Sequence, residues 1–110
     1  MDLAVHHIGI VVDDIDRAKE VYEKAFGLKI KGRYLVDEFN AECAFILVGN
    51  TYMEFVKPLA DDGLKKFLDK HGSGTLHHIC YLVEDIEEGW KYLKGKGLRS
   101  VTGEPQSTCT

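Results

Sequence analysis

The chain has 110 residues, of which 45% are hydrophobic and 29% charged. This balance is typical of one compact domain and excludes a disordered or collagen-like chain. The formal net charge of −4 leaves no basic field for nucleic acid or an anionic lipid surface. No apolar run approaches the roughly 20 residues that cross a bilayer, and no secretory signal pattern opens the chain. We expect a cytoplasmic protein without nucleic acid or membrane partners.

An internal repeat is the most informative feature of the sequence. The segment His6–Ile15 (HHIGIVVDDI) recurs as His77–Ile86 (HHICYLVEDI), and both copies continue through a helix-like stretch to a Gly-Leu pair. The repeat is too long for a solenoid unit and predicts two copies of one supersecondary module. We therefore expect one domain, 1–110, built from paired modules.

The first module, about residues 4–57, is predicted to be βαβββ. Asp13 and Asp14 offer an N-cap for its helix, and Gly27 supplies the left-handed residue that ends it. A Gly-Asn turn signal at 49–50 predicts a hairpin between the last two strands. The expected strands lie at 5–12, 28–36, 41–48 and 52–57.

A connecting helix at about 61–71 leads to the second module, about 75–110. Its expected elements are a strand at 76–83, a helix that begins after Asp85, and a short strand at 98–102. The tail from Gly103 is polar and shows no alternation, so the last two strands of a βαβββ module are not predicted there. The second module is therefore expected to be incomplete at its C-terminus.

Side-chain alternation separates the histidines from the core positions. His7 lies on the strand face opposite to Ile8 and Ile10, which we expect to pack on the helix, and His78 holds the equivalent place in the second copy. Glu54 stands in the middle of an apolar strand, where a buried carboxylate requires a partner. Two imidazoles and a carboxylate suit a divalent first-row ion with open coordination positions. A structural role for each histidine is the alternative.

The other histidines and the cysteines have simpler interpretations. His6 and His77 are expected on the opposite strand face, as packing groups or supports for the ligands. His71 ends a helix before Gly72 and is expected to interact with the helix dipole. Three cysteines at these spacings match neither a disulfide framework nor a zinc motif, so free thiols are expected at Cys43, Cys80 and Cys109. Cys80 is interpreted as a small buried hydrophobe.

These residues resemble the vicinal oxygen chelate superfamily, which includes glyoxalases, bleomycin resistance proteins and dioxygenases, and particularly its methylmalonyl-CoA epimerases. The resemblance covers about residues 5–105, and its most specific segments are HHIG at 6–9, Glu54 with KPL at 57–59, FLDKHG at 67–72, and LHHIC at 76–80 with VEDI at 83–86. It implies an α+β fold in which paired βαβββ modules form a glyoxalase-like cup around a metal ion.

The resemblance also implies a site and a reaction. His7, Glu54 and His78 match three of the family's four metal ligands, for Co, Mn, Ni or Zn; the fourth, a glutamate on the last strand of the second module, has no match here. In the implied epimerisation the metal chelates the thioester and carboxylate oxygens of an acyl-CoA and stabilises the enediolate formed by loss of the α-proton. Glu42 is the nearest match to one of the two required catalytic bases.

Several alternatives stay open at this point. They are a glyoxalase I-like lyase acting on a thiol adduct, a dioxygenase with Fe(II) on a two-His-one-carboxylate face, a non-catalytic binding member, and an inactive shortened form. Because the family pairs the first strand of each module with the last, the strand at 76–83 is expected to carry an unpaired edge, which is a template for association. We expect a homodimer or a domain-swapped assembly.

Overall fold

A computed structural model of the chain describes residues 3–99. The described residues divide into two compact units, one formed by Val5–Cys80 and the other by residues 3–4 together with 81–99. The larger unit holds every residue of the candidate site and all of the sheet except Ala4, Tyr81 and Leu82. The smaller unit contains the third helix.

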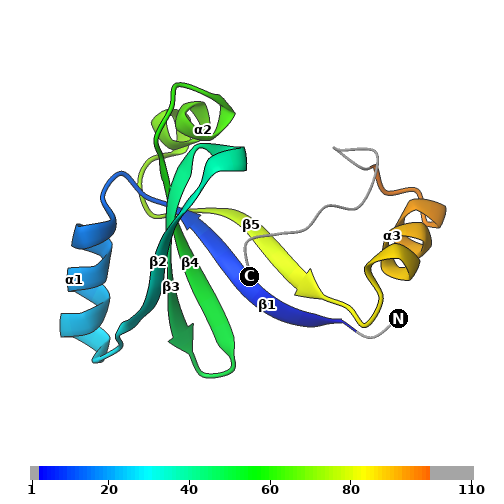
Figure 1. The fold of residues 1–110 in the computed structure, drawn as a ribbon, viewed down its shortest axis with the longest axis horizontal. Coiled ribbons are helices and arrows are strands. Elements are labelled where there is room, and N and C mark those ends of the chain that lie inside the picture. The colour runs from blue at the N-terminus through cyan, green and yellow to red at the C-terminus, as the bar shows by residue number, and fades with distance from the viewer. Residues whose placement is uncertain (1–2, 100–110) are drawn as a thin grey trace. The chain divides into compact units, whose positions relative to one another are not determined.

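The described residues form five strands, three α-helices and one short 3-10 helix, and Figure 1 shows the fold. In order they are β1 (Ala4–Val11), α1 (Ile15–Phe26), β2 (Ile30–Val36), the short 3-10 helix η1 (Asp37–Phe39), β3 (Ala41–Val48), β4 (Thr51–Pro58), α2 (Gly63–His71), β5 (Thr75–Leu82) and α3 (Ile86–Gly95).

This order confirms the predicted βαβββ module, the connecting helix and the start of a second copy, with strand ends that differ from the predicted ones by at most two residues. Leu98 and Arg99 are not in a strand. The rest of the short strand expected at 98–102, and the polar tail, lie outside the described residues.

The ends of the helices follow from local chemistry. Asp14 is extended and its side chain accepts a hydrogen bond from the backbone N–H of Arg17, which satisfies one of the unpaired donors of the first turn of α1. Gly27, at a φ of 67°, ends this helix in the left-handed conformation. Asp62 and Asp85 cap α2 and α3 in the same way as Asp14 caps α1.

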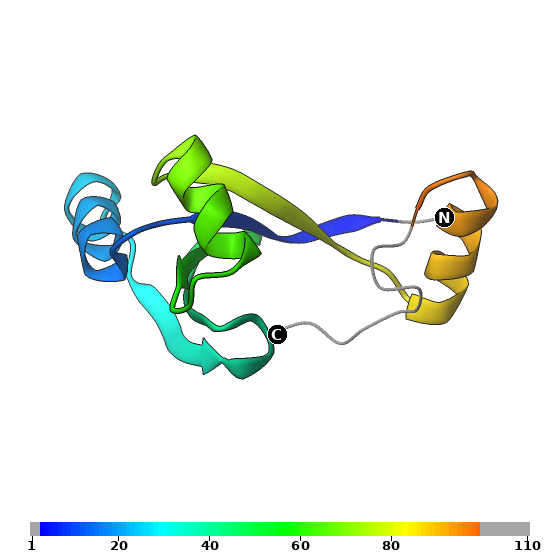
Figure 2. The same ribbon diagram turned by 90° about the horizontal axis from the view of Figure 1, so that it is seen from above.

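The strands form one sheet in the order β2-β3-β4-β1-β5. Strands β2, β3 and β4 pair antiparallel, whereas β1 and β4 pair parallel, so β1 lies between the last strand of its own module and the first strand of the repeat. Figure 2 shows β1 and β5 running side by side. The two copies of the repeated histidine pair are therefore adjacent in the sheet.

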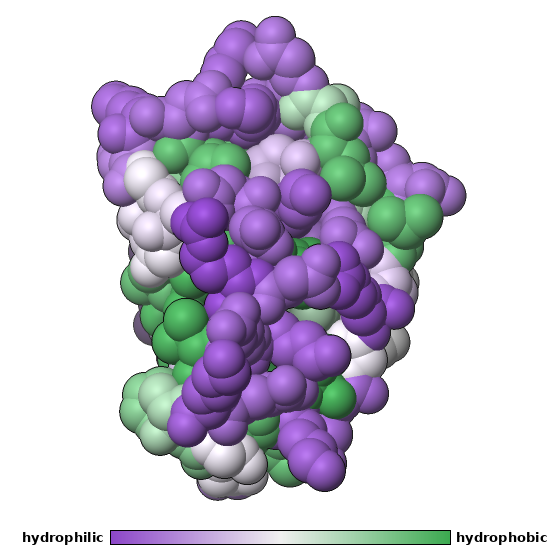
Figure 3. All heavy atoms as spheres, turned by 90° about the vertical axis from the view of Figure 1, so that its left-hand side faces the viewer, coloured by the Kyte–Doolittle hydropathy of each residue, from purple (hydrophilic) through white to green (hydrophobic). Residues whose placement is uncertain are grey.

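One face of the sheet is covered by α1. Val12, Ile15, Ala44, Ile46 and Phe55 form its buried cluster, and Ile10, Ala18, Tyr22 and Met53 pack against them. The predicted packing of Ile10 on the helix side of the sheet is confirmed. Hydrophilic side chains predominate on the side of the molecule seen in Figure 3, to which α1 turns its outer face.

The opposite face of the sheet carries a second buried cluster. Ala41, Cys43 and Val56 form it, with Tyr34, Val36 and Leu64 of α2 packed against them. Because side chains alternate along a strand, this is also the face onto which His7, Gly9 and Glu54 project.

Candidate metal centre

Three strands of the larger unit bring the predicted ligands together. His7 comes from β1, Glu54 from β4 and His78 from β5. In the sheet register His7 stands opposite Tyr52 and Glu54 stands opposite Phe45, so these side chains share the face that is not covered by α1. The ring of His7 contacts Phe45 on this face, with centroids 5.5 Å apart.

The ligand atoms of the three residues lie within 4.8 Å of one another. Nε2 of His7 lies 3.2 Å from Nε2 of His78 and 3.5 Å from Oε1 of Glu54, and Nε2 of His78 lies 3.3 Å from the same oxygen. Two ligand atoms on a tetrahedral ion with bonds of about 2.0–2.1 Å are about 3.3 Å apart. The three separations fit a single ion of this kind.

Burial and charge agree with that fit. His7 is 2% and Glu54 1% exposed, whereas the side chain of His78 is 37% exposed and leaves the cluster open on its side. Burial lowers the pKa of His7, against the opposing attraction of Glu54, and so favours the neutral ring whose lone pair can bind a cation. The partner expected for buried Glu54 is present: both imidazoles contact one carboxylate oxygen, and the Tyr34 hydroxyl donates to the other at 3.4 Å.

Gly9 makes room for the third ligand. A Cβ at residue 9 would overlap the ring of His78, which occupies that space. The requirement for glycine at residue 9 is steric and does not come from an unusual backbone conformation. A side chain there would prevent His78 from approaching His7 and Glu54.

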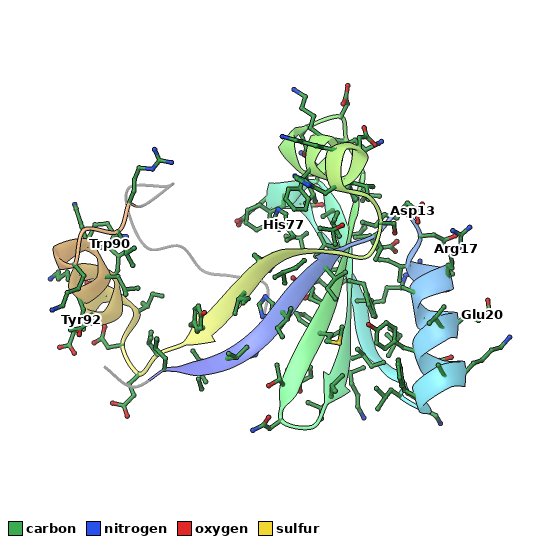
Figure 4. All side chains as sticks on the ribbon, turned by 180° about the vertical axis from the view of Figure 1, so that it is seen from behind. Asp13, Arg17, Glu20, His77, Trp90 and Tyr92 are labelled. Carbon is green, nitrogen blue, oxygen red and sulfur yellow. The ribbon has the colours of Figure 1, made fainter. Side chains whose placement is uncertain are left out.

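Each of the two ligand histidines forms a hydrogen bond with the histidine that precedes it in the chain. Nδ1 of His6 lies 2.8 Å from Nδ1 of His7, and Nδ1 of His77 lies 2.8 Å from Nδ1 of His78. His77 also packs edge-on against Phe67 of α2, beside which Figure 4 labels it. In each pair one nitrogen donates and the other accepts; a ligand histidine that donates from Nδ1 keeps the Nε2 lone pair for a metal.

Glu42 is not brought to this cluster. Its side chain lies on the α1 face of the sheet, where both oxygens accept hydrogen bonds from Arg33, at 3.0 and 3.2 Å. Arg33 also donates to Asp16 of α1 at 2.6 Å and lowers the pKa of that carboxyl. The role of Glu42 as a base stays a prediction, and this geometry shows it as one partner of an ion pair.

The remaining predicted residues are accounted for as follows. His71 is the last residue of α2, and its ring packs on Phe67 with centroids 4.5 Å apart. Cys43 is buried, Cys80 is half-buried rather than fully buried, and neither is in a disulfide. Cys109 lies outside the described residues.

The aromatic rings beside the cluster were not predicted from the sequence. On this face the ring of Phe45 contacts Tyr34, with centroids 5.6 Å apart, and Tyr52, with centroids 5.7 Å apart. They come from three different strands, and the sequence alone gives no register between strands. Only the pairing of Tyr34 with Cys43 and of Phe45 with Glu54 places them beside the carboxylate.

Among the described residues, none of the helices has the length and apolar character needed to cross a membrane.

Comparisons with known proteins assign a family to this arrangement. The model of the glyoxalase/bleomycin resistance protein/dioxygenase superfamily matches residues 6–109. The chain is 33% identical over 101 residues to human mitochondrial methylmalonyl-CoA epimerase, which covers 91% of this chain and 57% of that protein. It is 33% identical over 104 residues to the ethylmalonyl-CoA/methylmalonyl-CoA epimerase of Cereibacter sphaeroides, covering 93% of this chain and 78% of that one.

Solved structures agree with the sequence relatives. A Streptomyces coelicolor methylmalonyl-CoA epimerase variant in complex with 2-nitronate-propionyl-CoA superposes with a TM-score of 0.87 at 26% identity, covering 96% of this chain and 77% of that one. The predicted glyoxalase-like α+β fold is thereby confirmed. The chain spans just over half the length of the mammalian relatives it matches, 57% for the human protein.

Proposed function

Because the chain belongs to the glyoxalase/bleomycin resistance protein/dioxygenase superfamily, we propose that it catalyses proton transfer at the α-carbon of an acyl-CoA, with methylmalonyl-CoA as the first substrate to test. The observation that carries the proposal is the convergence of His7, Glu54 and His78 within 4.8 Å on one face of the sheet. The epimerase relatives support the choice of reaction.

The proposed cofactor is one divalent ion, Co, Mn, Ni or Zn, held by Nε2 of His7, Nε2 of His78 and Oε1 of Glu54. When bound, such an ion acts as a Lewis acid that draws electrons from carbonyl oxygens and so acidifies the adjacent C–H bond. The carboxylate supplies the negative charge that compensates part of the charge of the ion in a buried place. Tyr34 holds the other carboxylate oxygen, which keeps Oε1 directed at the two imidazoles.

Access to the cluster is one-sided. His7 and Glu54 are buried and fixed by their neighbours, whereas His78 is partly exposed. Phe45 lies against His7 and Tyr34 lies against Phe45, so these rings exclude water from the sheet side of the cluster. A substrate would approach from the side of His78, and coordination positions not filled by the protein would face it.

The proposed reaction also needs groups that transfer the proton. Glu42 stays the base predicted from the family resemblance, although its carboxylate is held by Arg33. Epimerisation needs a proton acceptor on one face of the α-carbon and a donor on the other. Removal and return of a proton on a single face would exchange it with solvent without inverting the carbon, so exchange and inversion are measured separately.

We also propose that two copies of the chain associate through strand β5. Strand β5 ends the sheet order of the described residues, and the outer side of an end strand offers unpaired N–H and C=O groups to another chain. A second copy pairing there would form a symmetric, closed interface. The expected homodimer and the expected cytoplasmic location both stay predictions; the mammalian relatives are mitochondrial by name.

The test is exchange of the α-proton of methylmalonyl-CoA in D₂O, followed by mass spectrometry on the Co²⁺-loaded full chain. We expect a gain of one mass unit that requires the ion and is lost in His78→Ala. Inversion is followed in parallel by a stereospecific coupled assay. The hemithioacetal of glutathione and methylglyoxal, run under the same conditions, tests the lyase alternative. Ion binding without exchange of the acyl-CoA proton would contradict the proposed substrate class.

A further inference from the structure

A second cluster of metal-ligating atoms lies beside the first. Ligand atoms of His6, His7 and Cys80 all lie within 4.8 Å of one another. His7 is buried, and His6 and Cys80 are half-buried, so an ion could reach the cluster from solvent. All three residues belong to the larger unit, His6 and His7 on β1 and Cys80 on β5.

The thiol of this cluster lies at a position where the two copies of the repeat differ. The two copies differ at one position of their first four residues, which is Gly9 in the first copy and Cys80 in the second. In the first copy the empty space at Gly9 is filled by the ring of His78. In the second copy Cys80 takes this position, and its ligand atom lies within 4.8 Å of those of His6 and His7. The first copy has no thiol at the equivalent position.

The chemistry of this cluster differs from that of the His7–Glu54–His78 cluster. Two imidazoles with a thiolate favour thiophilic cations such as Zn²⁺, Cd²⁺ and Cu⁺, whereas two imidazoles with a carboxylate also suit harder ions such as Mn²⁺. Nδ1 of His6 and Nδ1 of His7 are 2.8 Å apart. A ring rotation that opens this separation to about 3.3 Å would allow both nitrogens to bind one tetrahedral ion.

His7 is a member of both clusters, and its two ring nitrogens face different neighbours. Its Nδ1 faces His6, whereas its Nε2 faces Glu54 and His78. A neutral imidazole carries one lone pair and one N–H, so binding of a metal at Nδ1 leaves Nε2 protonated and unable to bind a second one. Occupation of one cluster therefore opposes occupation of the other.

We propose that His6, His7 and Cys80 form a second metal site for a thiophilic cation, and that its occupation displaces the ion held by His7, Glu54 and His78. Cys80 binds as the thiolate and releases its thiol proton to solvent. The second site is inferred from its own geometry. The displacement of an ion from His7, Glu54 and His78 rests on the proposed function.

The first test is a titration with Cd²⁺, whose bond to a thiolate gives a charge-transfer band in the ultraviolet. The background is the full chain with Cys43→Ala and Cys109→Ser, which removes the other two thiols. We expect the band to saturate at one equivalent, to disappear in Cys80→Ser, and to need at least about 10-fold more Cd²⁺ in His6→Ala. Glu54→Gln should keep the band while losing Mn²⁺ binding, which separates this site from the proposed catalytic one.

A second measurement does not depend on the folding of any His6 variant. The Mn²⁺-loaded chain receives one equivalent of Cd²⁺, and released Mn²⁺ is followed by electron paramagnetic resonance. We expect release in the chain with Cys80 and its loss in Cys80→Ser. A band that persists in Cys80→Ser, full affinity in His6→Ala, or equal Mn²⁺ release with and without Cys80 would each overturn the proposal.

Discussion

The imidazole of His78 lies over the backbone of Gly9, in the space that a side chain at residue 9 would occupy. This relationship joins the two copies of the repeat at their most similar positions. The candidate metal centre therefore depends on glycine at residue 9, because His78 reaches Glu54 and His7 only if residue 9 has no side chain.

Gly9→Ala should displace His78 and weaken divalent-ion binding by about 10- to 100-fold, the range seen when the support of a metal ligand is lost. The ring can move aside, so the fold should persist. Isothermal titration with Co²⁺ measures the change. Gly32→Ala is the matched control, since a Cβ on this strand glycine meets nothing within 4 Å. Equal losses in the two variants would refute the steric argument.

Glu54→Gln keeps the shape of the side chain and removes its charge. We expect Co²⁺ affinity to fall by more than about 100-fold, since a ligand should matter more than the groups that support it. The metal-free protein should be as stable as before or more so, because a carboxylate that is 1% exposed is costly to bury. Urea denaturation with a chelator measures the stability. A large loss of stability without any loss of affinity would mean a purely structural Glu54.

The metal-free protein should lose stability as the pH falls below about 6.5. Burial lowers the pKa of His7 and of His77 below the ordinary value of 6.5, so the folded state binds fewer protons than the unfolded state in this range. The stability is therefore complete above pH 6.5 and decreases as the pH falls through the lowered pKa values.

Urea midpoints at pH values from about 7.5 to about 5, in the presence of a chelator, follow this dependence. His77→Gln, which removes one titrating ring and keeps a polar partner for His78, should reduce the slope. A midpoint that does not change between pH 7.5 and 5 would contradict the lowered pKa values of His7 and His77.

The position of Glu42 leads to a test of its predicted catalytic role. Its pairing with Arg33 is partly exposed, and Glu42→Gln should cost about 0.2–1 kcal/mol of unfolding free energy. Asp16→Asn removes the other carboxylate that binds Arg33 and serves as the control. Loss of α-proton exchange in Glu42→Gln but not in Asp16→Asn would support a base at residue 42; equal exchange in both would leave Glu42 a structural residue.

Association through β5 predicts an effect of charge at this strand. Ile79 of β5 is 41% exposed, and Ile79→Lys should shift the chain toward the monomer, because an edge lysine opposes strand pairing. Val48→Lys is the control, since Val48 is 39% exposed but belongs to the inner strand β3. Light scattering at several concentrations distinguishes the species. A wild-type chain that stays monomeric at high micromolar concentration would contradict the proposal.

Much of the fold was predictable because the strong signals are local. Asp14 and Gly27 mark the ends of α1 through capping chemistry, and alternation in β1 and β4 separates Ile10 and Phe55 from His7 and Glu54. The repeat predicted that His7 and His78 would be close together, since related copies pack at equivalent positions.

The contacts across strands were not predictable in the same way. The placement of Tyr34 and Phe45 beside Glu54 depends on the register of three strands. Glu42 and Glu54 lie on adjacent strands, and only the pairing of Glu54 with Phe45 shows that Glu42 projects to the other face. A one-residue change of register would exchange the faces, so a single sequence leaves such assignments open.

We propose that His7, Glu54 and His78 hold one divalent ion. The most direct measurement is an anomalous difference map from crystals of the full chain grown with Co²⁺. We expect a single dominant peak within about 2.0–2.2 Å of Nε2 of His7, Nε2 of His78 and a carboxylate oxygen of Glu54. A fully occupied Co²⁺ peak that none of these three residues contacts, or no peak at saturating Co²⁺, would contradict it.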